Sequence, residues 1–298
     1  MRLAAIDIGS NAARLLIEDV IQNARAKPEF IKVALVRVPL RLGFDVFEKG
    51  RISKERITKI IKSLNAYKLL LEVYEVQHLK ACATSAMRDA QNGKQIIKKV
   101  KDETGISIKI ISGQEEASYI YENHIAENLK NDLSYLYINV GGGSTELAFF
   151  SDGKLIAKDS FNIGTIRLLK KQVTDAMWDK MKKFIISNTR GYHRVACIGS
   201  GGNINKVFSL TKQYEGEPLA LDDLGELYNE LKSHTLLQRM SKFKLREDRA
   251  DVIVPALQIF INVMRWAESN DVYVPKIGLA DGLIHILYDE VTAARIIH

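Results

Sequence analysis

The feature that most constrains this chain is a pattern that occurs twice along it. Each copy reads as a strand, a turn rich in glycine and polar residues, a second strand, a short turn and a third strand, followed by helix and strand. The first copy places its strands at Arg2–Ile8, Arg14–Val20 and Phe30–Val38. The second places them at Tyr135–Val140, Leu147–Phe150 and Leu155–Phe161. The repetition predicts an α/β protein built by duplication of one domain.

The remaining elements fit the same plan. Helices are expected over Ser53–Tyr74, Lys94–Asp102, Glu115–Glu127, up to Phe208, over Asp251–Glu268 with a kink at Pro255, and after Asp281; further strands are expected at His78–Ala83, Ser107–Ile111, Val195–Ile198 and Val272–Val274. Residues 1–126 and 127–298 form the two expected domains, and the closing helix is expected to pack back on the first. Since clefts between domains are favoured ligand sites, we expect the functional residues there.

Composition limits the class of protein. With 298 residues, 46% of them hydrophobic and 27% charged, the chain can bury two cores and is not disordered. It has no run of about 18 apolar residues, so the sequence predicts no membrane-spanning helix. Cys82 and Cys197 lie in apolar strand-like segments and predict buried thiols in a reducing cytoplasm. The net charge of +7 favours polyanionic partners, although a solvated basic surface explains it equally simply.

The first turn contains residues suited to an anion and a metal ion. In Asp7-Ile8-Gly9-Ser10-Asn11, glycine allows the backbone to approach a ligand, and Ser10 and Asn11 add donors. Asp7, at the end of its strand, suits a magnesium ion held through water. A plain hairpin turn is the alternative interpretation.

The second turn is the stronger signal. Gly141-Gly142-Gly143-Ser144-Thr145-Glu146 places three glycines between two strands, where glycine weakens pairing unless the backbone must approach something closely. A phosphate group meets that requirement, and Glu146 opens the next strand beside it. Gly199-Ser200-Gly201-Gly202-Asn203 is a third candidate phosphate loop.

Two junctions between strand and helix add further candidates. Thr84 and Ser85 occur where a helix is expected to begin, as phosphate contacts or simple caps, and Arg88 offers a guanidinium suited to phosphate oxygens. Glu115 and Glu116 open another helix and point about 100° apart, so one can face the ligand while the other caps the helix. A carboxylate near a bound phosphate could deprotonate a water molecule.

These motifs together resemble a known family. They are Asp7-Ile-Gly-Ser-Asn, Ala83-Thr-Ser-Ala-Met-Arg-Asp-Ala, Ile111-Ser-Gly-Gln-Glu-Glu-Ala, Gly141-Gly-Gly-Ser-Thr-Glu, Gly199-Ser-Gly-Gly-Asn and Arg249-Ala-Asp-Val-Ile-Val-Pro. In this order they resemble the exopolyphosphatase/guanosine pentaphosphate phosphatase (Ppx/GppA) family, in its short two-domain form. The resemblance implies a duplicated ribonuclease-H-like fold, as in actin and sugar kinases, with a cleft between the domains.

The resemblance also implies an activity and roles for residues. It implies hydrolysis of phosphoanhydride bonds at the end of inorganic polyphosphate or of guanosine pentaphosphate, assisted by Mg²⁺ or Mn²⁺. By position, Glu116 matches the base that activates water and Glu146 the second acidic residue, while Asp7 and Glu146, with Asn139, match the metal side. The matching phosphate contacts are Gly9, Ser10, Asn11, Arg88, Gly142, Gly143, Ser144 and Thr145.

One departure leaves alternatives open. The family usually has aspartate two residues before the triple glycine, where this chain has Asn139. A regulatory protein that binds polyphosphate or guanosine tetraphosphate without turnover is therefore the second hypothesis, and a kinase on the same fold is the third. No specific nucleic acid or membrane partner is expected, and a homodimer is compatible with the sequence.

Overall fold

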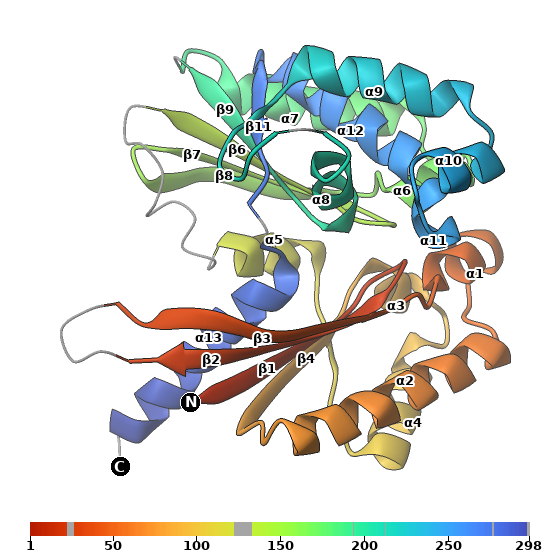
Figure 1. The fold of residues 1–298 in the computed structure, drawn as a ribbon, viewed down its shortest axis with the longest axis vertical. Helices are drawn as coiled ribbons and strands as arrows, with labels where there is room; N and C mark the ends of the chain where they lie inside the picture. The colour runs from red at the N-terminus through yellow and green to blue at the C-terminus, as the bar shows by residue number, and fades with distance from the viewer. Residues whose placement is uncertain (23–26, 122–132, 193, 212, 276, 297–298) are drawn as a thin grey trace. The chain divides into compact units, whose positions relative to one another are not determined.

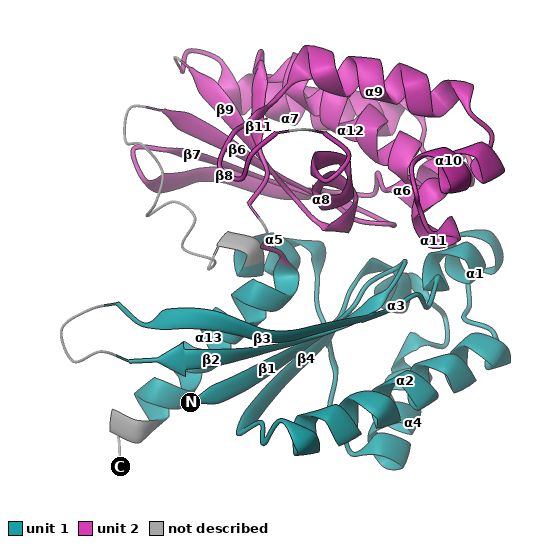
Figure 2. Cartoon of the chain, viewed as in Figure 1, with its two compact units in different colours: residues 1–123, 279–298 teal, residues 124–278 magenta. Residues whose placement is uncertain are grey.

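The computed structural model describes residues 1–22, 27–121, 133–192, 194–211, 213–275 and 277–296, and the chain divides into two compact units. Unit 1 comprises residues 1–123 and 279–298, and unit 2 comprises residues 124–278 (Figure 2). The boundary expected after residue 126 falls outside the described residues. Each unit contains one mixed β-sheet with helices packed on it (Figure 1).

The elements of unit 1 follow the expected order, with α1 as an addition that the sequence did not predict. Its strands are β1 (Arg2–Ile8), β2 (Ala13–Ile21), β3 (Glu29–Val38), β4 (His78–Ala83) and β5 (Lys109–Ile110). Its helices are α1 (Leu42–Lys49), α2 (Lys54–Val73), α3 (Ser85–Asp89), α4 (Gly93–Thr104), α5 (Gly113–Tyr121) and α13 (Leu279–Ile296). The sheet order is β3-β2-β1-β4-β5, with β4 parallel to β1 and β2 antiparallel to it.

The elements of unit 2 repeat this arrangement and extend it. Its strands are β6 (Ser134–Val140), β7 (Thr145–Ser151), β8 (Lys154–Phe161), β9 (Val195–Ser200), β10 (Leu219–Ala220) and β11 (Asp271–Tyr273). Its helices are α6 (Thr165–Leu169), α7 (Asp175–Thr189), α8 (Gly202–Phe208), α9 (Leu221–Ser233), α10 (Leu236–Lys242), α11 (Glu247–Ala250) and α12 (Ile253–Trp266). The sheet order β10-β11-β9-β6-β7-β8 contains the same sequence of strands as unit 1, so the predicted duplication is confirmed.

The core of unit 1 depends on the end of the chain. Side chains alternate across a strand, so Leu3 and Ala5 of β1 face one side of the sheet. On that side they pack in one cluster with Leu283 and Ile284 of the closing helix α13, and Phe30 of β3 stacks on His285 with ring centroids 3.9 Å apart. On β2 and β3, the hydroxyl of Tyr67 in α2 donates to the carbonyl oxygens of Ala13 and Val36.

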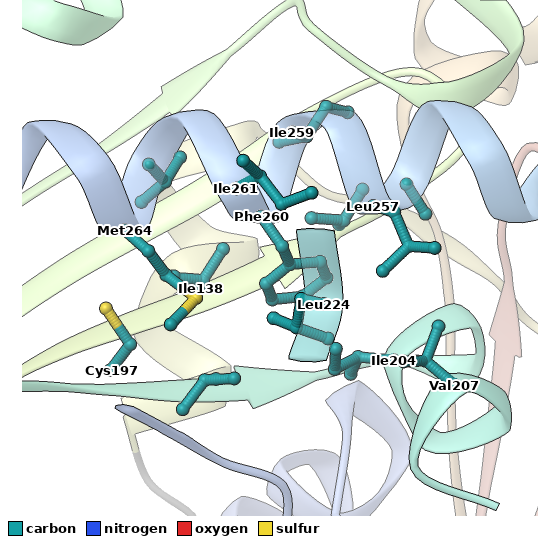
Figure 3. Packing of buried hydrophobic residues seen from close by; sticks show 14 of the residues in the cluster. Ile138, Cys197, Ile204, Val207, Leu224, Leu257, Ile259, Phe260, Ile261 and Met264 are labelled. Atoms are coloured by element: carbon teal, nitrogen blue, oxygen red, sulfur yellow. The ribbon is translucent and has the colours of Figure 1, made fainter. Parts of the chain in front are cut away.

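The core of unit 2 is built around α12. Apolar residues recur on this helix so that Leu257, Phe260 and Met264 are all fully buried (Figure 3). They pack in one cluster with Ile138 of β6 and Cys197 of β9, as Figure 3 shows. The cluster fixes β6 and β9, the two strands that lead into the glycine loops.

The structure differs from one expectation drawn from the sequence and agrees with two others. The kink expected at Pro255 is wrong, because α12 begins at Ile253 and places Pro255 in its first turn, where a missing N–H costs no helical hydrogen bond. The short turn expected between the second and third strands of the second copy is a hairpin turn at Asp152-Gly153, with φ of 50° and 69° at its two residues. Cys82 and Cys197 are buried free thiols, as expected.

Candidate functional site

The first glycine loop, between β1 and β2, is held by hydrogen bonds to its carbonyl groups. The N–H of Gly9 donates to the carbonyl of Ala12 over 3.0 Å, which closes the turn. The carbonyls of Ser10 and Asn11 accept bonds of 2.8 Å each from the N–H groups of Gly43 and Arg41, at the start of α1. The backbone of this loop is therefore fixed by the helix that follows β3.

The second glycine loop, between β6 and β7, has the same construction. The N–H of Gly141 donates to the carbonyl of Ser144 over 2.9 Å, and the carbonyls of Gly141 and Gly142 accept from Thr165 and Ile166 at the start of α6. Within the described part of the chain, the N–H groups of Gly142, Gly143 and Ser144 donate no backbone hydrogen bond. This loop is thus anchored by its carbonyls and keeps a run of amides available for an anion.

The side chains around the second loop complete this anchoring. The guanidinium of Arg167 donates to the carbonyl of Gly143 over 2.7 Å, and the hydroxyl of Thr145 donates to the carbonyl of Ile163 over 2.6 Å. Thr145 is fully buried, so its hydroxyl positions the loop. Gly164 makes the arrangement possible, because a Cβ there would lie 2.5 Å from the carbonyl oxygen of Gly142.

Unit 1 brings most of its candidate residues together. The hydroxyls of Ser10 and Ser85 lie 2.8 Å apart, so α3 contacts the first loop directly. Arg88, one turn further along α3, donates to the carbonyl of Ile111 over 2.8 Å, which joins it to the segment that precedes α5. The loop, the start of α3 and the start of α5 therefore form one polar region in unit 1.

The two glutamates at the start of α5 have different surroundings. The carboxylate of Glu115 accepts from the N–H of Ser112 over 2.8 Å and from Lys109 over 2.7 Å. The hydrogen bond from Lys109 comes first among the causes that lower the pKa of Glu115 to about 2, followed by the bond from Ser112. Glu115 is therefore the capping residue, whereas Glu116 is 6% exposed and lies on the inner side of the helix.

Asp7 lies in a buried charged environment. Burial raises its pKa, an effect that Asp281 of α13 strengthens and that Arg14 opposes, with Arg14 Nη1 3.1 Å from Asp7 Oδ2. Burial raises the pKa of the Cys82 thiol, and the charges of Asp7 and Glu116 raise it further, so both carboxyl groups lie near Cys82 in unit 1. Asp281 was missed by the sequence analysis, because an acid in a first helical turn is expected from the helix dipole alone.

Glu18 of β2 belongs to the same face of the sheet and predicts a pH-dependent stability. Burial, reinforced by Asp281 and opposed by Lys32, raises its pKa to about 7 from 4.5. Folded Glu18 therefore keeps a proton that the unfolded chain releases, so stability falls as pH rises from 4.5 through 7. The difference between the two pKa values corresponds to a loss of at most about 3 kcal/mol in the free energy of unfolding. Urea unfolding at a series of pH values is expected to show this loss in the wild type and not in Glu18→Gln; parallel pH profiles would contradict the assignment.

In unit 2, Asn139 and Glu146 form a buried pair across β6 and β7. Asn139 Nδ2 donates to Glu146 Oε2 over 2.9 Å, and the hydroxyl of Ser160 donates to Glu146 Oε1 over 3.1 Å. Asn139 Oδ1 accepts in turn from Ser200 over 3.2 Å, at the start of the third glycine loop. The carboxylate of Glu146, 1% exposed, thus accepts hydrogen bonds from two neutral side chains. In the third loop, Asn203 accepts from Arg249 over 2.9 Å.

The structure groups the predicted residues by unit. Asp7, Gly9, Ser10, Asn11, Arg88 and Glu116 lie in unit 1, and Asn139, Gly142, Gly143, Ser144, Thr145 and Glu146 lie in unit 2. The cleft expected between the domains stays a prediction, as does the role of each residue in catalysis. None of the described helices combines the length and apolar character that crossing a membrane requires.

Two sheets of the same strand order, each with an anchored glycine loop, define a protein of the two-domain actin-like class. Residues 20–291 match the Ppx/GppA phosphatase family, and the chain belongs to that family. A crystal structure of the Aquifex aeolicus family member has the same fold, with a TM-score of 0.74, 26% identity, and coverage of 99% of this chain and 98% of that one.

Two curated relatives resemble part of the chain. The bifunctional 3-dehydroquinate synthase/phosphatase of Fusobacterium nucleatum subsp. nucleatum is 36% identical over 175 residues, 56% of this chain and 26% of that protein. Exopolyphosphatase 2 of Mycobacterium tuberculosis is 31% identical over 175 residues, 57% of this chain and 54% of that protein. The alignments thus span about a quarter and about half of the relatives' lengths.

Proposed function

We propose that the chain hydrolyses the terminal phosphoanhydride bond of inorganic polyphosphate or of guanosine pentaphosphate. The observation that carries the proposal is the anchored second glycine loop, whose N–H groups of Gly142, Gly143 and Ser144 suit the oxygens of a phosphate group. Membership of a phosphatase family and the name of the exopolyphosphatase relative support hydrolysis as the reaction.

Glu116 is the proposed base. A carboxylate that accepts a proton from water as the water attacks phosphorus accelerates the reaction. The partly exposed Glu115 caps the helix with Lys109 and Ser112, whereas Glu116 is buried and matches the position of the base in the family motif, so the proposal assigns Glu116 to water. Ser10, Asn11 and Arg88 are the proposed donors to phosphate in unit 1.

Magnesium fits the donors that the chain offers. In the parts of the chain that the structure describes, no three His, Cys, Asp or Glu side chains form a metal site by themselves. Magnesium does not require such a set, since it keeps several waters and is often held by one or two carboxylates with substrate phosphates. Asp7 and Glu146, with Asn139 as a further oxygen donor, are the proposed ligands, and Mn²⁺ would suit the same set. The ion would neutralise charge on the phosphate oxygens.

The proposal is tested by orthophosphate release from long polyphosphate and from guanosine pentaphosphate, measured side by side. We expect release from at least one substrate with magnesium, and its loss in excess chelator. Full activity in chelator would contradict the metal requirement, and absence of release from both would contradict the proposal.

One observation favours a second candidate function, a protein that binds polyphosphate or guanosine tetraphosphate without turnover. The amide of Asn139 donates a hydrogen bond to the carboxylate of Glu146, where an aspartate at this position would add a second carboxylate suited to a metal ion. Calorimetric binding of polyphosphate with no release of orthophosphate would select this candidate.

Asn139→Asp is expected to make the protein bind magnesium more tightly. The new carboxylate would replace a donor 2.9 Å from Glu146 Oε2, and two carboxylates so close do not both ionise without a cation. The magnesium concentration for half-maximal activity is expected to fall roughly tenfold, equivalent to ~1.4 kcal/mol. The measurement is a magnesium titration of both proteins on one polyphosphate.

The control is Asn65→Asp, the same exchange at an exposed position of α2. It is expected to leave the magnesium titration unchanged. If Asn139→Asp also leaves the half-saturating concentration unchanged, residue 139 does not contact the metal.

A further inference from the structure

Unit 2 contains a large pocket of about 900 Å³. Its lining includes Leu133, which precedes β6, the first residues of β9, and residues near the ends of α7 and α12. β6 and β9 are parallel, so these residues gather at the amino ends of both strands. All the residues that line the pocket belong to unit 2.

The pocket is separate from the glycine loops of the same unit. Those loops follow the carboxyl ends of β6 and β9, at Gly141 and Gly201. The 7 residues of β6 span roughly 20 Å at about 3.3 Å per residue, which is the separation between the two ends of the strand. A ligand of nucleotide size in the pocket would therefore not occupy the proposed phosphate site.

The lining of the pocket carries an excess of cations. Lys182, Arg190, Arg194 and Arg265 line it, all exposed, against two acids, Glu268 and Asp271. Within the described part of the chain, none of the four cations is within salt-bridge distance of an acid. Arg190 and Arg265 lie at the carboxyl ends of α7 and α12, where the helix dipole favours a cation. Arg194 precedes β9, so no helix dipole accounts for its charge.

Aromatic rings line the same pocket. Tyr192 is 39% exposed and packs edge to face on Phe149, with ring centroids 5.0 Å apart. Trp266 is half-buried and packs in the same way on Trp178, with centroids 5.8 Å apart. Each ring is thus held in place by a second ring while still lining the pocket. Fixed rings beside unpaired arginines are the combination that binds a planar base and its phosphates.

We infer that this pocket is a second ligand site, which binds a nucleotide through its phosphates on Arg190, Arg194 and Arg265 and through its base on Trp266 or Tyr192. The site goes beyond the proposed function, because hydrolysis at the glycine loops does not require it. Its ligand is defined by the presence of both a phosphate group and a planar ring.

The experiment uses GTP as the probe and inorganic tripolyphosphate as the control that lacks a ring, both in chelator so that no hydrolysis intervenes. The affinity of the pocket for GTP is measured from a fluorescence titration, and that of tripolyphosphate from its ability to displace GTP, so that binding at the glycine loops does not contribute. Tryptophan fluorescence, excited at the red edge of the indole band, reports where the probe binds. The chain has 2 tryptophans, of which Trp266 lines the pocket and Trp178 is in contact with Trp266. GTP is expected to quench this fluorescence and to bind at least about tenfold more tightly than tripolyphosphate, because base stacking is lost in the latter.

The variant is Arg194→Gln/Arg265→Gln, and its matched control is Arg51→Gln/Lys154→Gln, which removes two exposed cations elsewhere. The pocket variant is expected to bind GTP at least about tenfold more weakly, and the control to bind as the wild type does. Equal melting temperatures of the two variants exclude misfolding as the cause. Absence of quenching, equal affinity for GTP and tripolyphosphate, or wild-type affinity in the pocket variant would each overturn the inference.

Discussion

Glu116→Gln is expected to lower turnover of polyphosphate by about 10²–10⁴-fold, the range typical for loss of a general base. The amide keeps the shape of the side chain and its burial in the first turn of α5, but it does not take a proton from water. Binding of polyphosphate is expected to remain, because the proposed phosphate donors lie on other segments. Single-turnover release of orthophosphate, with binding measured separately, tests both parts.

Glu115→Gln is the matched control, since it makes the same exchange one residue away. Contacts with Lys109 and Ser112 keep Glu115 ionised. Removal of this charge should therefore affect the start of α5 and leave turnover close to that of the wild type. If Glu116→Gln retains turnover, or if Glu115→Gln loses as much, the base has been assigned wrongly.

Gly164→Ala is expected to produce the largest loss of stability among these variants, about 3 kcal/mol. The added Cβ would lie 2.5 Å from the carbonyl oxygen of Gly142 and 2.5 Å from the carbonyl carbon of Gly143. Both contacts are with backbone, which side-chain rotation cannot relieve. The φ of −141° at Gly164 is open to alanine, so the cost is steric. Displacement of the loop by about 1 Å should also lower turnover by about 10²-fold.

Gly225→Ala provides the control for this exchange. Gly225 lies inside α9 with no atom within 4 Å of the position that a Cβ would take. Alanine there is expected to stabilise the protein by about 0.5–1 kcal/mol, as it does inside helices generally. Chemical unfolding of the two variants measures the contrast, and a stability of Gly164→Ala equal to the wild type would show that α6 does not hold the loop as described.

Local patterns in the sequence were sufficient to predict most of the fold. Short apolar runs bounded by turn residues located β1, β2 and β6 to within two residues at each end, and the repeated order of elements predicted the duplication. Helix α1 was missed because it spans only Leu42–Lys49, which is barely two turns. Its N-cap, Arg41, has a φ of 55° and no side-chain capping bond, so no capping motif in the sequence marks the start of the helix. Strand β5 is shorter than expected, since only Lys109 and Ile110 pair with β4.

The candidate site was predictable only where its chemistry is concentrated in short motifs. The glycine loops and the Glu115-Glu116 pair are such motifs. Contacts between distant segments were not predictable: the position of Asp281 beside Asp7 depends on α13 returning to β1, and the need for Gly164 depends on how α6 meets the second loop. Asn139 could be recognised as a departure from the family, but its hydrogen bond to Glu146 required the structure.

The return of α13 to unit 1 has a consequence for the order in which the protein can form. During synthesis β1, β2 and β4 leave the ribosome before unit 2, yet the apolar face made by Leu3, Ala5 and Leu16 is covered by α13, which follows unit 2 in the chain. Unit 2 holds its own core in one continuous stretch of chain and has no such delay. The apolar side of the first sheet therefore stays uncovered until α13 has been synthesised, and exposed apolar surface of this kind favours aggregation of a nascent chain.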